Sequence, residues 1–251
     1  MIHYIVAVWL GPRRVQPVNN PYAYLRHQLY FLKNSKSIDK TTFVVNHYDT
    51  ELEKEIEPII ASFGVKASVI YRKNLGCSYA AFQEAIIQNL EYDYHFLIED
   101  DCVPANANFL VPYLNEMKED TIFSTVYATG DGAGLLSGKF AKEVYSKNGV
   151  VFKLCDSITY GDCEWNQLHF LDYLKEMGRV STLKNHCYWY QWPNPLPDWL
   201  RGRPSHLQVG KLVIEAPKFN IASQNYSDKC FADSTCTIAP VSVWQTYHKL
   251  L

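Results

Sequence analysis

Residues 94–101 of the chain read YHFLIEDD, an apolar run of strand length that ends directly in three carboxylates. A continuous apolar run is typical of a strand that is buried on both faces, as in a parallel sheet. Clustered carboxylates repel one another unless a cation is shared between them. The stretch therefore predicts a buried strand that delivers Glu99, Asp100 and Asp101 to the sheet edge where such folds hold ligands. The alternative is a solvated acidic turn at the start of a helix.

The first hundred residues alternate between strand and helix patterns. Apolar runs of strand length predict strands over 2–10, 41–49, 66–72 and 94–98. Apolar residues at helical spacing predict helices over 22–32, 51–63 and 78–90, with Ser78 as the N-cap of the last. This order predicts an α/β fold with a mainly parallel central sheet and helices on both faces.

The pattern changes after residue 104. A helix is predicted over 108–120, a strand over 121–129, a glycine-rich turn with a short strand and a helix over 130–147, and a loop running into a helix over 160–178. From Trp189 onward the sequence is aromatic and rich in proline, without a clear period. We expect one domain over 1–251, made of a Rossmann-like nucleotide-binding half (1–104), an acceptor half (105–190) and an irregular aromatic segment (191–251).

Composition excludes several classes of protein. The chain has 251 residues, 47% of them hydrophobic, and a formal net charge of -2, so the basic bias of nucleic-acid-binding proteins is missing. No apolar run is long enough to span a membrane, and the first residues lack a leader pattern. The expected location is the cytoplasm, either free or peripheral to a membrane. The seven cysteines show no paired C-x-x-C spacing, which favours reduced, structural thiols.

The order of these segments resembles the Leloir glycosyltransferases of the GT-A fold over roughly residues 2–190. The segments FLIEDDCVPANANFL, GLLSGKFAKEVYS, ITYGDCEWNQLHFL and LKNHCYW are similar, in order and approximate spacing, to segments of inverting N-acetylglucosaminyltransferases. The resemblance implies transfer of a sugar from a nucleotide diphosphate, with UDP favoured, to a hydroxyl of a saccharide acceptor. It places the chain in glycan or polysaccharide biosynthesis.

The resemblance also implies a divalent metal, Mn²⁺ or Mg²⁺, bound by Asp101, with Glu99 and Asp100 reaching the ribose or the metal's waters. Carboxylate oxygens suit a hard cation, which would neutralise the charge of the departing diphosphate. His186, in LKNHCYW, takes the position of a second metal ligand in similar enzymes. A lone histidine is otherwise more often a structural residue.

Five residues are expected on the donor side. They lie at the ends of the first three predicted strands or directly after them, and they are Arg13, Arg14, Asn46, Arg72 and Asn74. Guanidinium groups match phosphate oxygens, and the polar residues that end the second strand, including His47, lie where similar enzymes contact the base or ribose. The alternative is that they are ordinary loop and surface residues.

An inverting transfer needs a carboxylate that takes the proton from the attacking hydroxyl. The segment GDCEW offers Asp162 and Glu164. Aligned on the tryptophan, Glu164 takes the place of the catalytic carboxylate of similar enzymes, which is usually aspartate, and Asp162 could instead cap the next helix. Two other functions stay open, namely a non-catalytic sugar- or nucleotide-binding module and a sugar nucleotidyltransferase. The latter would normally carry a glycine-rich loop after the first strand, where this chain has WLGPRRVQPVNN.

Overall fold

The computed structural model describes residues 1–10, 22–33, 35–100, 102–104, 109–125, 133–152, 173–183 and 238–240. The strands are β1 (Ile2–Val8), β2 (Lys40–His47), β3 (Ser68–Lys73), β4 (Tyr94–Glu99), β5 (Cys102–Pro104), β6 (Thr121–Thr125), β7 (Ala133–Ser137), β8 (Arg179–Thr182) and β9 (Ile238–Pro240). The helices are α1 (Ala23–Leu32), α2 (Thr50–Glu53), α3 (Ile56–Ser62), α4 (Cys77–Ile87), α5 (Leu110–Glu116) and α6 (Gly138–Asn148).

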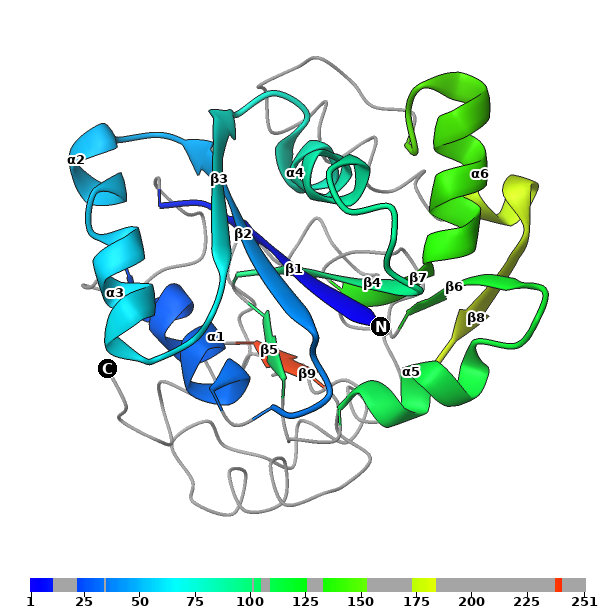
Figure 1. The fold of residues 1–251 in the computed structure, drawn as a ribbon, viewed down its shortest axis with the longest axis horizontal. Coiled ribbons are helices and arrows are strands. Elements are labelled where there is room, and N and C mark those ends of the chain that lie inside the picture. The colour runs from blue at the N-terminus through cyan, green and yellow to red at the C-terminus, as the bar shows by residue number, and fades with distance from the viewer. Residues whose placement is uncertain are drawn as a thin grey trace, which may run out of the picture.

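Seven of these strands form one twisted sheet in the order β3-β2-β1-β4-β7-β6-β8 (Figure 1). The neighbours β3, β2, β1 and β4 are parallel, and β6 is parallel to β8. Only β7 runs against its neighbours within this described sheet, pairing antiparallel with both β4 and β6. The predicted α/β class with a mainly parallel sheet is confirmed, and the sheet order places β1 in its interior.

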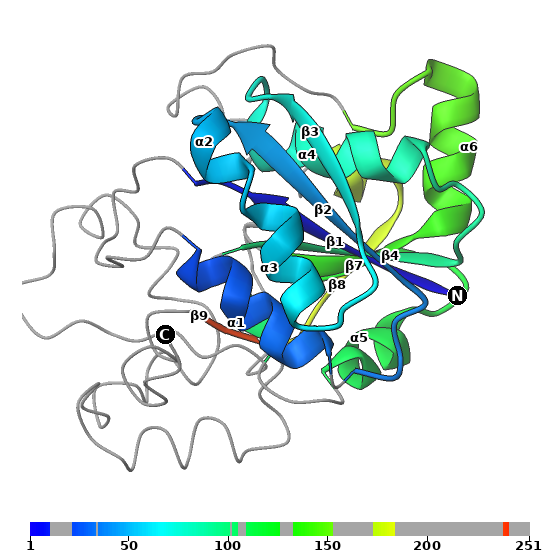
Figure 2. The same ribbon diagram turned by 60° about the vertical axis from the view of Figure 1, so that its left-hand side comes forward.

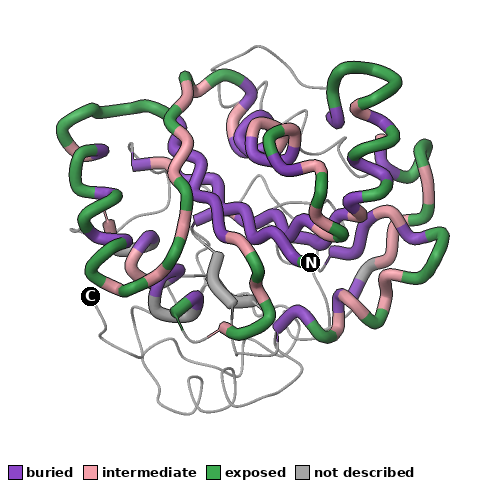
Figure 3. Tube along the Cα trace, in the orientation of Figure 1, coloured by how far each residue is buried: buried purple, intermediate pink, exposed green. Residues whose placement is uncertain are grey.

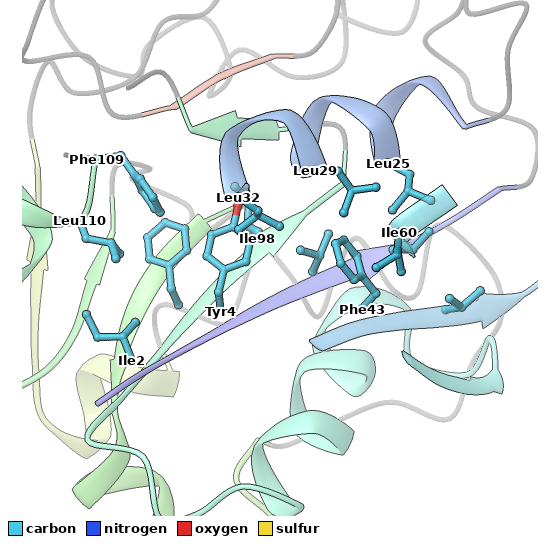
Figure 4. Close-up of a cluster of buried hydrophobic side chains, with 14 of the residues drawn as sticks. Ile2, Tyr4, Leu25, Leu29, Leu32, Phe43, Ile60, Ile98, Phe109 and Leu110 are labelled. Carbon is cyan, nitrogen blue, oxygen red and sulfur yellow. The ribbon is translucent and has the colours of Figure 1, made fainter. Parts of the chain in front are cut away.

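Helices cover both faces of the sheet (Figure 2). One core layer joins the sheet to α1, α3 and α5, and the other joins it to α4 and α6. All seven residues of β1 are buried, because its side chains point alternately into the two layers, and β1, β2 and β4 form the buried interior in Figure 3. In Figure 4, Leu25 and Leu29 of α1 lie over Phe43 of β2 in the first layer. The acidic segment thus leaves a rigid, fully covered strand.

The helix predicted over 51–63 is two helices, α2 and α3, and the prediction of one was wrong. Asp49 caps α2 by accepting hydrogen bonds from the backbone N–H groups of Glu51 and Leu52. Pro58 explains the break, since its ring clashes with the carbonyl four residues earlier and it lacks an N–H. That earlier residue is Lys54, the C-cap of α2.

The described parts of the remaining helices and strands are shorter than predicted. The helix expected over 108–120 is α5, and the strand expected over 121–129 is described as β6, with residues 126–129 outside the described part of the chain. Of the helix expected over 160–178, the described residues 173–177 are helical. Most of the aromatic segment 191–251 is also outside the described residues. No helix in the described ranges is long and apolar enough to cross a membrane.

Two histidines lie side by side in the layer beneath α4. His3 of β1 and His95 of β4 are both fully buried, with their Nδ1 atoms 3.2 Å apart. His3 Nε2 lies 2.8 Å from Thr42 Oγ1, and His95 Nε2 has no hydrogen-bond partner among the described residues. Burial, His95 and Lys40 lower the pKa of His3 to about 3, and burial lowers the pKa of His95 to about 4. The fold therefore requires both imidazoles to be neutral.

This pair predicts acid sensitivity. The unfolded chain takes up protons on these histidines near pH 6.5, whereas the folded chain resists protonation down to about pH 4 and 3, so stability is full above pH 6.5 and falls below it. Between pH 6.5 and pH 5 each histidine should cost on the order of 2 kcal/mol. Urea unfolding at pH 7.5, 6 and 5 measures the loss, and His95→Leu should flatten the pH dependence. Equal urea midpoints for the parent chain at pH 7.5 and pH 5 would contradict the prediction.

Candidate functional site

The carboxyl ends of β1 to β4 meet at one edge of the sheet because these four strands are parallel. The register places Ala7 opposite Glu99, and Asn46 opposite Arg72. Residues that follow the strands therefore gather at this edge although they are far apart in sequence. Of the predicted donor-side residues, the structure brings Asn46, Arg72, Glu99 and Asp100 to this edge.

The acidic segment at the end of β4 is held from two sides. Ser78 Oγ donates a 2.6 Å hydrogen bond to Glu99 Oε1, which ties the first carboxylate to the start of α4. Asp100 is 3% exposed, and its Oδ2 accepts a 3.1 Å hydrogen bond from the backbone N–H of Trp9, after β1. These contacts fix the direction in which the chain leaves β4. Asp101, the predicted metal ligand, is outside the described residues.

A third contact supports the same segment from the opposite face of the sheet. Gln28 of α1 donates from Nε2 to the backbone carbonyl of Glu99 (3.3 Å) and accepts from the hydroxyl of Tyr4 (2.8 Å). Gln28 and Tyr4 are fully buried. A buried hydrogen-bonded chain of this kind is costly to break, so it favours one position of the strand end.

Ser78 is not the N-cap of α4, and that prediction was wrong. The helix begins one residue earlier, at Cys77, and its N-cap is Gly76. Gly76 and Cys77 both have positive φ, at 71° and 49°, so two successive residues in the left-handed region turn the chain sharply from β3 into α4. Ser78 then lies in the first turn, where its hydroxyl reaches Glu99 instead of the backbone of its own helix.

Arg72 and Asn46 form a polar pair across β3 and β2. Arg72 Nη1 donates to Asn46 Oδ1 (2.6 Å), and Nη2 donates to the carbonyl of Leu75 (2.8 Å). Asn46 Nδ2 donates to the carbonyl of Cys77 (3.4 Å). Burial lowers the pKa of Arg72, and Glu84 and Cys77 act in the opposite direction. The pair places a guanidinium group at the turn that also contains the half-buried Asn74.

Four aromatic rings lie at or directly after the ends of β1, β2 and β3, and we call them the aromatic ledge: Trp9, His47, Tyr48 and Tyr71. Trp9 meets Tyr48 edge to face with ring centroids 5.2 Å apart, and His47 stacks on Tyr71 at 5.8 Å. Tyr48 is 51% exposed and Tyr71 is 38% exposed. Partly exposed rings at a ligand-binding edge can stack on a planar ligand.

A buried carboxylate orients the aromatic ledge. Glu53 of α2 is 4% exposed and accepts from His47 Nδ1 (2.6 Å) and from the backbone N–H of Tyr48 (2.9 Å). Because a carboxylate only accepts, this contact places a hydrogen on Nδ1 and leaves Nε2 as the other polar atom of His47. Burial, Glu57 and Glu53 raise the pKa of Tyr71 to about 12, so its hydroxyl stays protonated at neutral pH.

Sequence reasoning placed His47 at this edge but missed the rest of the aromatic ledge and Glu53. The available signal was an aromatic residue directly after β1 (Trp9) and after β2 (Tyr48). Glu53 could not be found, because its role depends on how α2 packs against the end of β2.

Six predicted site residues are outside the described part of the chain: Arg13, Arg14, Asp101, Asp162, Glu164 and His186. Within the described part, no group of three or more His, Cys, Asp or Glu side chains could hold a metal ion. The metal and catalytic assignments therefore stay predictions.

No protein-family model and no curated protein matches the sequence. Among solved structures, a mannosyltransferase from Pyrobaculum calidifontis in complex with GDP-Man and Mn²⁺ covers 93% of this chain and 70% of its own, with a TM-score of 0.52 and 9% identity. The structure of TarS residues 1–349 from S. aureus matches 73% of this chain and 58% of the TarS chain, with a TM-score of 0.48 and 12% identity. A cytidylyltransferase from Leptospira borgpetersenii matches 78% of this chain and 76% of its own chain, with a TM-score of 0.46 and 15% identity.

At such low identity, the likeness to the mannosyltransferase establishes the fold alone. The chain has a mixed α/β fold of the GT-A type, as the sequence predicted. Glycosyltransferases and a cytidylyltransferase both occur among the similar structures. The finer resemblance to N-acetylglucosaminyltransferases stays a prediction.

Proposed function

We propose that the protein is a metal-dependent inverting glycosyltransferase, which moves a sugar from a nucleotide diphosphate to a hydroxyl of a saccharide acceptor. The observation that carries the proposal is the acidic segment at the end of β4, held by Ser78 and Trp9 beside the Arg72–Asn46 pair. A fixed acidic segment next to a guanidinium group and exposed aromatic rings suits a ligand with a planar base, a diphosphate and a bound cation.

The donor would lie along the carboxyl ends of β1 to β4. The aromatic ledge is suited to the nucleobase, and Arg72 to the diphosphate, together with the predicted Arg13 and Arg14. Asn46 and Asn74 would supply neutral hydrogen bonds nearby. UDP is the first candidate nucleotide, and GDP belongs in the same test.

The carboxylate chemistry at the end of β4 fits a hard divalent cation. Asp101 and His186 would hold Mn²⁺ or Mg²⁺, with Glu99 and Asp100 supporting the turn through their contacts to Ser78 and Trp9. When bound, the cation would neutralise the negative charge that develops on the leaving diphosphate.

The acceptor side would use Glu164 as the general base, which takes the proton of the attacking hydroxyl. The attack forms a new glycosidic bond as the bond to the diphosphate breaks, so the anomeric configuration inverts. Asp162 lies two residues earlier and is the alternative carboxylate.

Two other functions fit the same fold. A nucleotidyltransferase would need a glycine-rich phosphate loop after β1, and the sequence there, GPRRVQPVNN from residue 11, contains one glycine. A non-catalytic binding module would keep the donor-side residues but would not need Glu164. A nucleotidyltransferase differs from a glycosyltransferase in the product it forms, and a binding module forms no product.

A panel of nucleotide sugars tests the proposal. With Mn²⁺ present, the correct donor should raise the melting temperature, because a ligand that binds the native state adds stability in proportion to ln(1 + [L]/Kd). The same donor should be slowly hydrolysed to nucleoside diphosphate and free sugar, and EDTA should stop the reaction. Release of pyrophosphate from a nucleoside triphosphate would instead identify a nucleotidyltransferase, and binding without turnover would identify a binding module.

Arg72→Ala is expected to weaken binding of UDP or GDP by roughly 10- to 100-fold, the value of a charged hydrogen bond of about 1.5–3 kcal/mol. Binding of the uncharged nucleoside should change less, because the aromatic ledge remains. Arg72→Lys keeps the charge but loses the fork that binds Asn46 and the carbonyl of Leu75, so it should recover only part of the affinity. Calorimetry with the diphosphate and the nucleoside measures both effects. Equal losses for both ligands would assign Arg72 to the structure of the turn.

A further inference from the structure

A carboxylate and an imidazole are joined at the end of β2, and we call them the Glu53–His47 pair. Glu53 accepts from His47 Nδ1 with one oxygen (2.6 Å) and from the backbone N–H of Tyr48 with the other (2.9 Å). α2 follows β2 after a short turn, which brings Glu53 back to the strand end (Figure 1). Glu53 is buried, whereas the side chain of His47 is 41% exposed. The pair therefore connects a buried acceptor to an imidazole that a ligand can reach.

The position of the His47 ring is fixed from two sides. Glu53 holds its Nδ1 edge, and Tyr71 stacks on one face at an angle of 18° between the ring planes. Tyr71 is held in turn, because its hydroxyl donates to Glu57 Oε1 at 3.3 Å. Among the described residues, His47 Nε2 has no hydrogen-bond partner. A fixed ring with one nitrogen left over is suited to contact a single atom of a ligand.

The carboxylate also decides which nitrogen of His47 carries the hydrogen. A carboxylate only accepts hydrogen bonds, so the hydrogen of the neutral imidazole is on Nδ1. Nε2 then has a lone pair and can only accept. A ligand atom that meets Nε2 must therefore be a donor, because two acceptors that face each other leave both lone pairs unsatisfied.

Nucleobases differ at the ring nitrogen that such an acceptor would meet. Uracil and guanine carry a ring N–H beside a carbonyl group, whereas cytosine and adenine have a lone pair on the corresponding nitrogen. Aromatic surface for stacking lies beside His47, since Tyr48 is the next residue along the chain, is 51% exposed and meets Trp9 edge to face. The strand end thus offers a planar base both a stacking surface and an acceptor for its edge.

We propose that His47, positioned by Glu53, selects the base of the nucleotide, so that uracil or guanine nucleotides bind in preference to cytosine or adenine nucleotides. The inference rests on the donor site of the proposed function and names the class of base that this site takes. His47 contacts the base, and Glu53 acts through His47 by fixing its tautomer. Neither role depends on the bound cation.

Calorimetry on the full-length chain tests the selection at pH 8, where the neutral imidazole is the ordinary form of histidine. The probes are UDP, CDP, GDP and ADP with Mg²⁺ present, because the diphosphate and the cation are the same in each probe and cancel in the ratio. The parent should bind UDP roughly tenfold more tightly than CDP, or GDP than ADP if the site takes purines. Equal affinities within the pair that binds, or a preference for CDP or ADP, would overturn the proposal.

His47→Asn removes the selecting atom and can keep the link to Glu53. The asparagine amide can still donate to the carboxylate from about the position of Nδ1, but it has no atom at the position of Nε2. The variant should therefore bind UDP and CDP with about the same affinity, because it has lost the acceptor that distinguishes them. A preference for UDP that persists in His47→Asn would show that another group selects the base.

Glu53→Gln separates a role in selection from a role in the fold. The backbone N–H of Tyr48 can only donate, so it keeps the one oxygen of the glutamine amide, and the NH₂ group faces His47. The hydrogen of the imidazole then moves to Nε2, which becomes a donor, and the preference should change from UDP to CDP. Glu57→Gln is the matched control and should keep the preference of the parent, because Glu57 accepts from Tyr71 rather than from His47.

The outcomes separate this inference from the proposed function. If Glu53→Gln weakens UDP and CDP binding by the same factor, Glu53 only supports the fold, and the inference is wrong while the donor site remains. If the parent binds none of the four diphosphates, the donor site of the proposed function is wrong as well. Urea unfolding shows whether Glu53→Gln is folded, and if it is not, the affinities of His47→Asn decide.

Discussion

Replacing Glu164 with glutamine is expected to lower turnover by about 10²- to 10⁴-fold, the usual contribution of a general base, while nucleotide-sugar binding stays close to that of the parent. Glutamine keeps the size of the side chain but cannot take the proton from the acceptor hydroxyl. Single-turnover kinetics and calorimetry measure the two quantities separately.

Asp162→Asn is the control for this prediction, and its effect on the rate should be much smaller. The stereochemistry of the product is the second measurement. If NMR finds the anomeric configuration of the donor retained in the product, the single-displacement mechanism and the role of Glu164 are both wrong.

Replacing Asp101 with asparagine is expected to abolish most metal-dependent donor binding and to leave the fold intact. The substitution removes one negative charge from a predicted cation site and keeps the shape of the side chain. Calorimetry with Mn²⁺ and nucleotide measures the loss. Parent-like binding of both would place the metal site elsewhere.

Three further variants provide the comparison for this result. His186→Ala should weaken Mn²⁺ binding by about tenfold or more if the histidine is a ligand. Asp120→Asn is the surface control, because Asp120 forms an exposed ion pair with Arg179 and should not affect the metal. Asp100→Asn should instead destabilise the fold, since Asp100 is buried against the backbone N–H of Trp9.

Much of the fold could be predicted from the sequence because each strand of a covered parallel sheet is an apolar run with polar residues on both sides. The four strands of the first hundred residues were all found in this way. The sheet order was not predicted, and neither was the antiparallel direction of β7, because pairing depends on contacts between distant segments. Close approach at Gly134, where any side chain would collide with the ring of Phe123, shows how tightly β7 fits beside β6.

The candidate site was predicted where it depends on strand ends, and missed where it depends on tertiary contacts. Asn46, Arg72, Glu99 and Asp100 lie at the edge where the strand ends meet, whereas the hydrogen bond between Asn46 and Arg72 was not predicted. Glu53 reaches His47 because α2, capped by Asp49, turns back onto the end of β2. Ser78 contacts Glu99 because of two left-handed residues before it, of which Cys77 is not a glycine and gives no sequence signal.

The interior position of β1 determines the order in which the chain can fold. β1 pairs with β2 on one side and with β4 on the other, and His3 and His95 are 92 residues apart in sequence. Protein synthesis adds roughly 5–20 residues per second, so about 5–20 s pass between the synthesis of β1 and the synthesis of β4. During that time a mainly apolar strand with a free edge can pair with another chain. We therefore expect the yield of native protein from cells to depend on chaperones that bind the first hundred residues as they emerge from the ribosome.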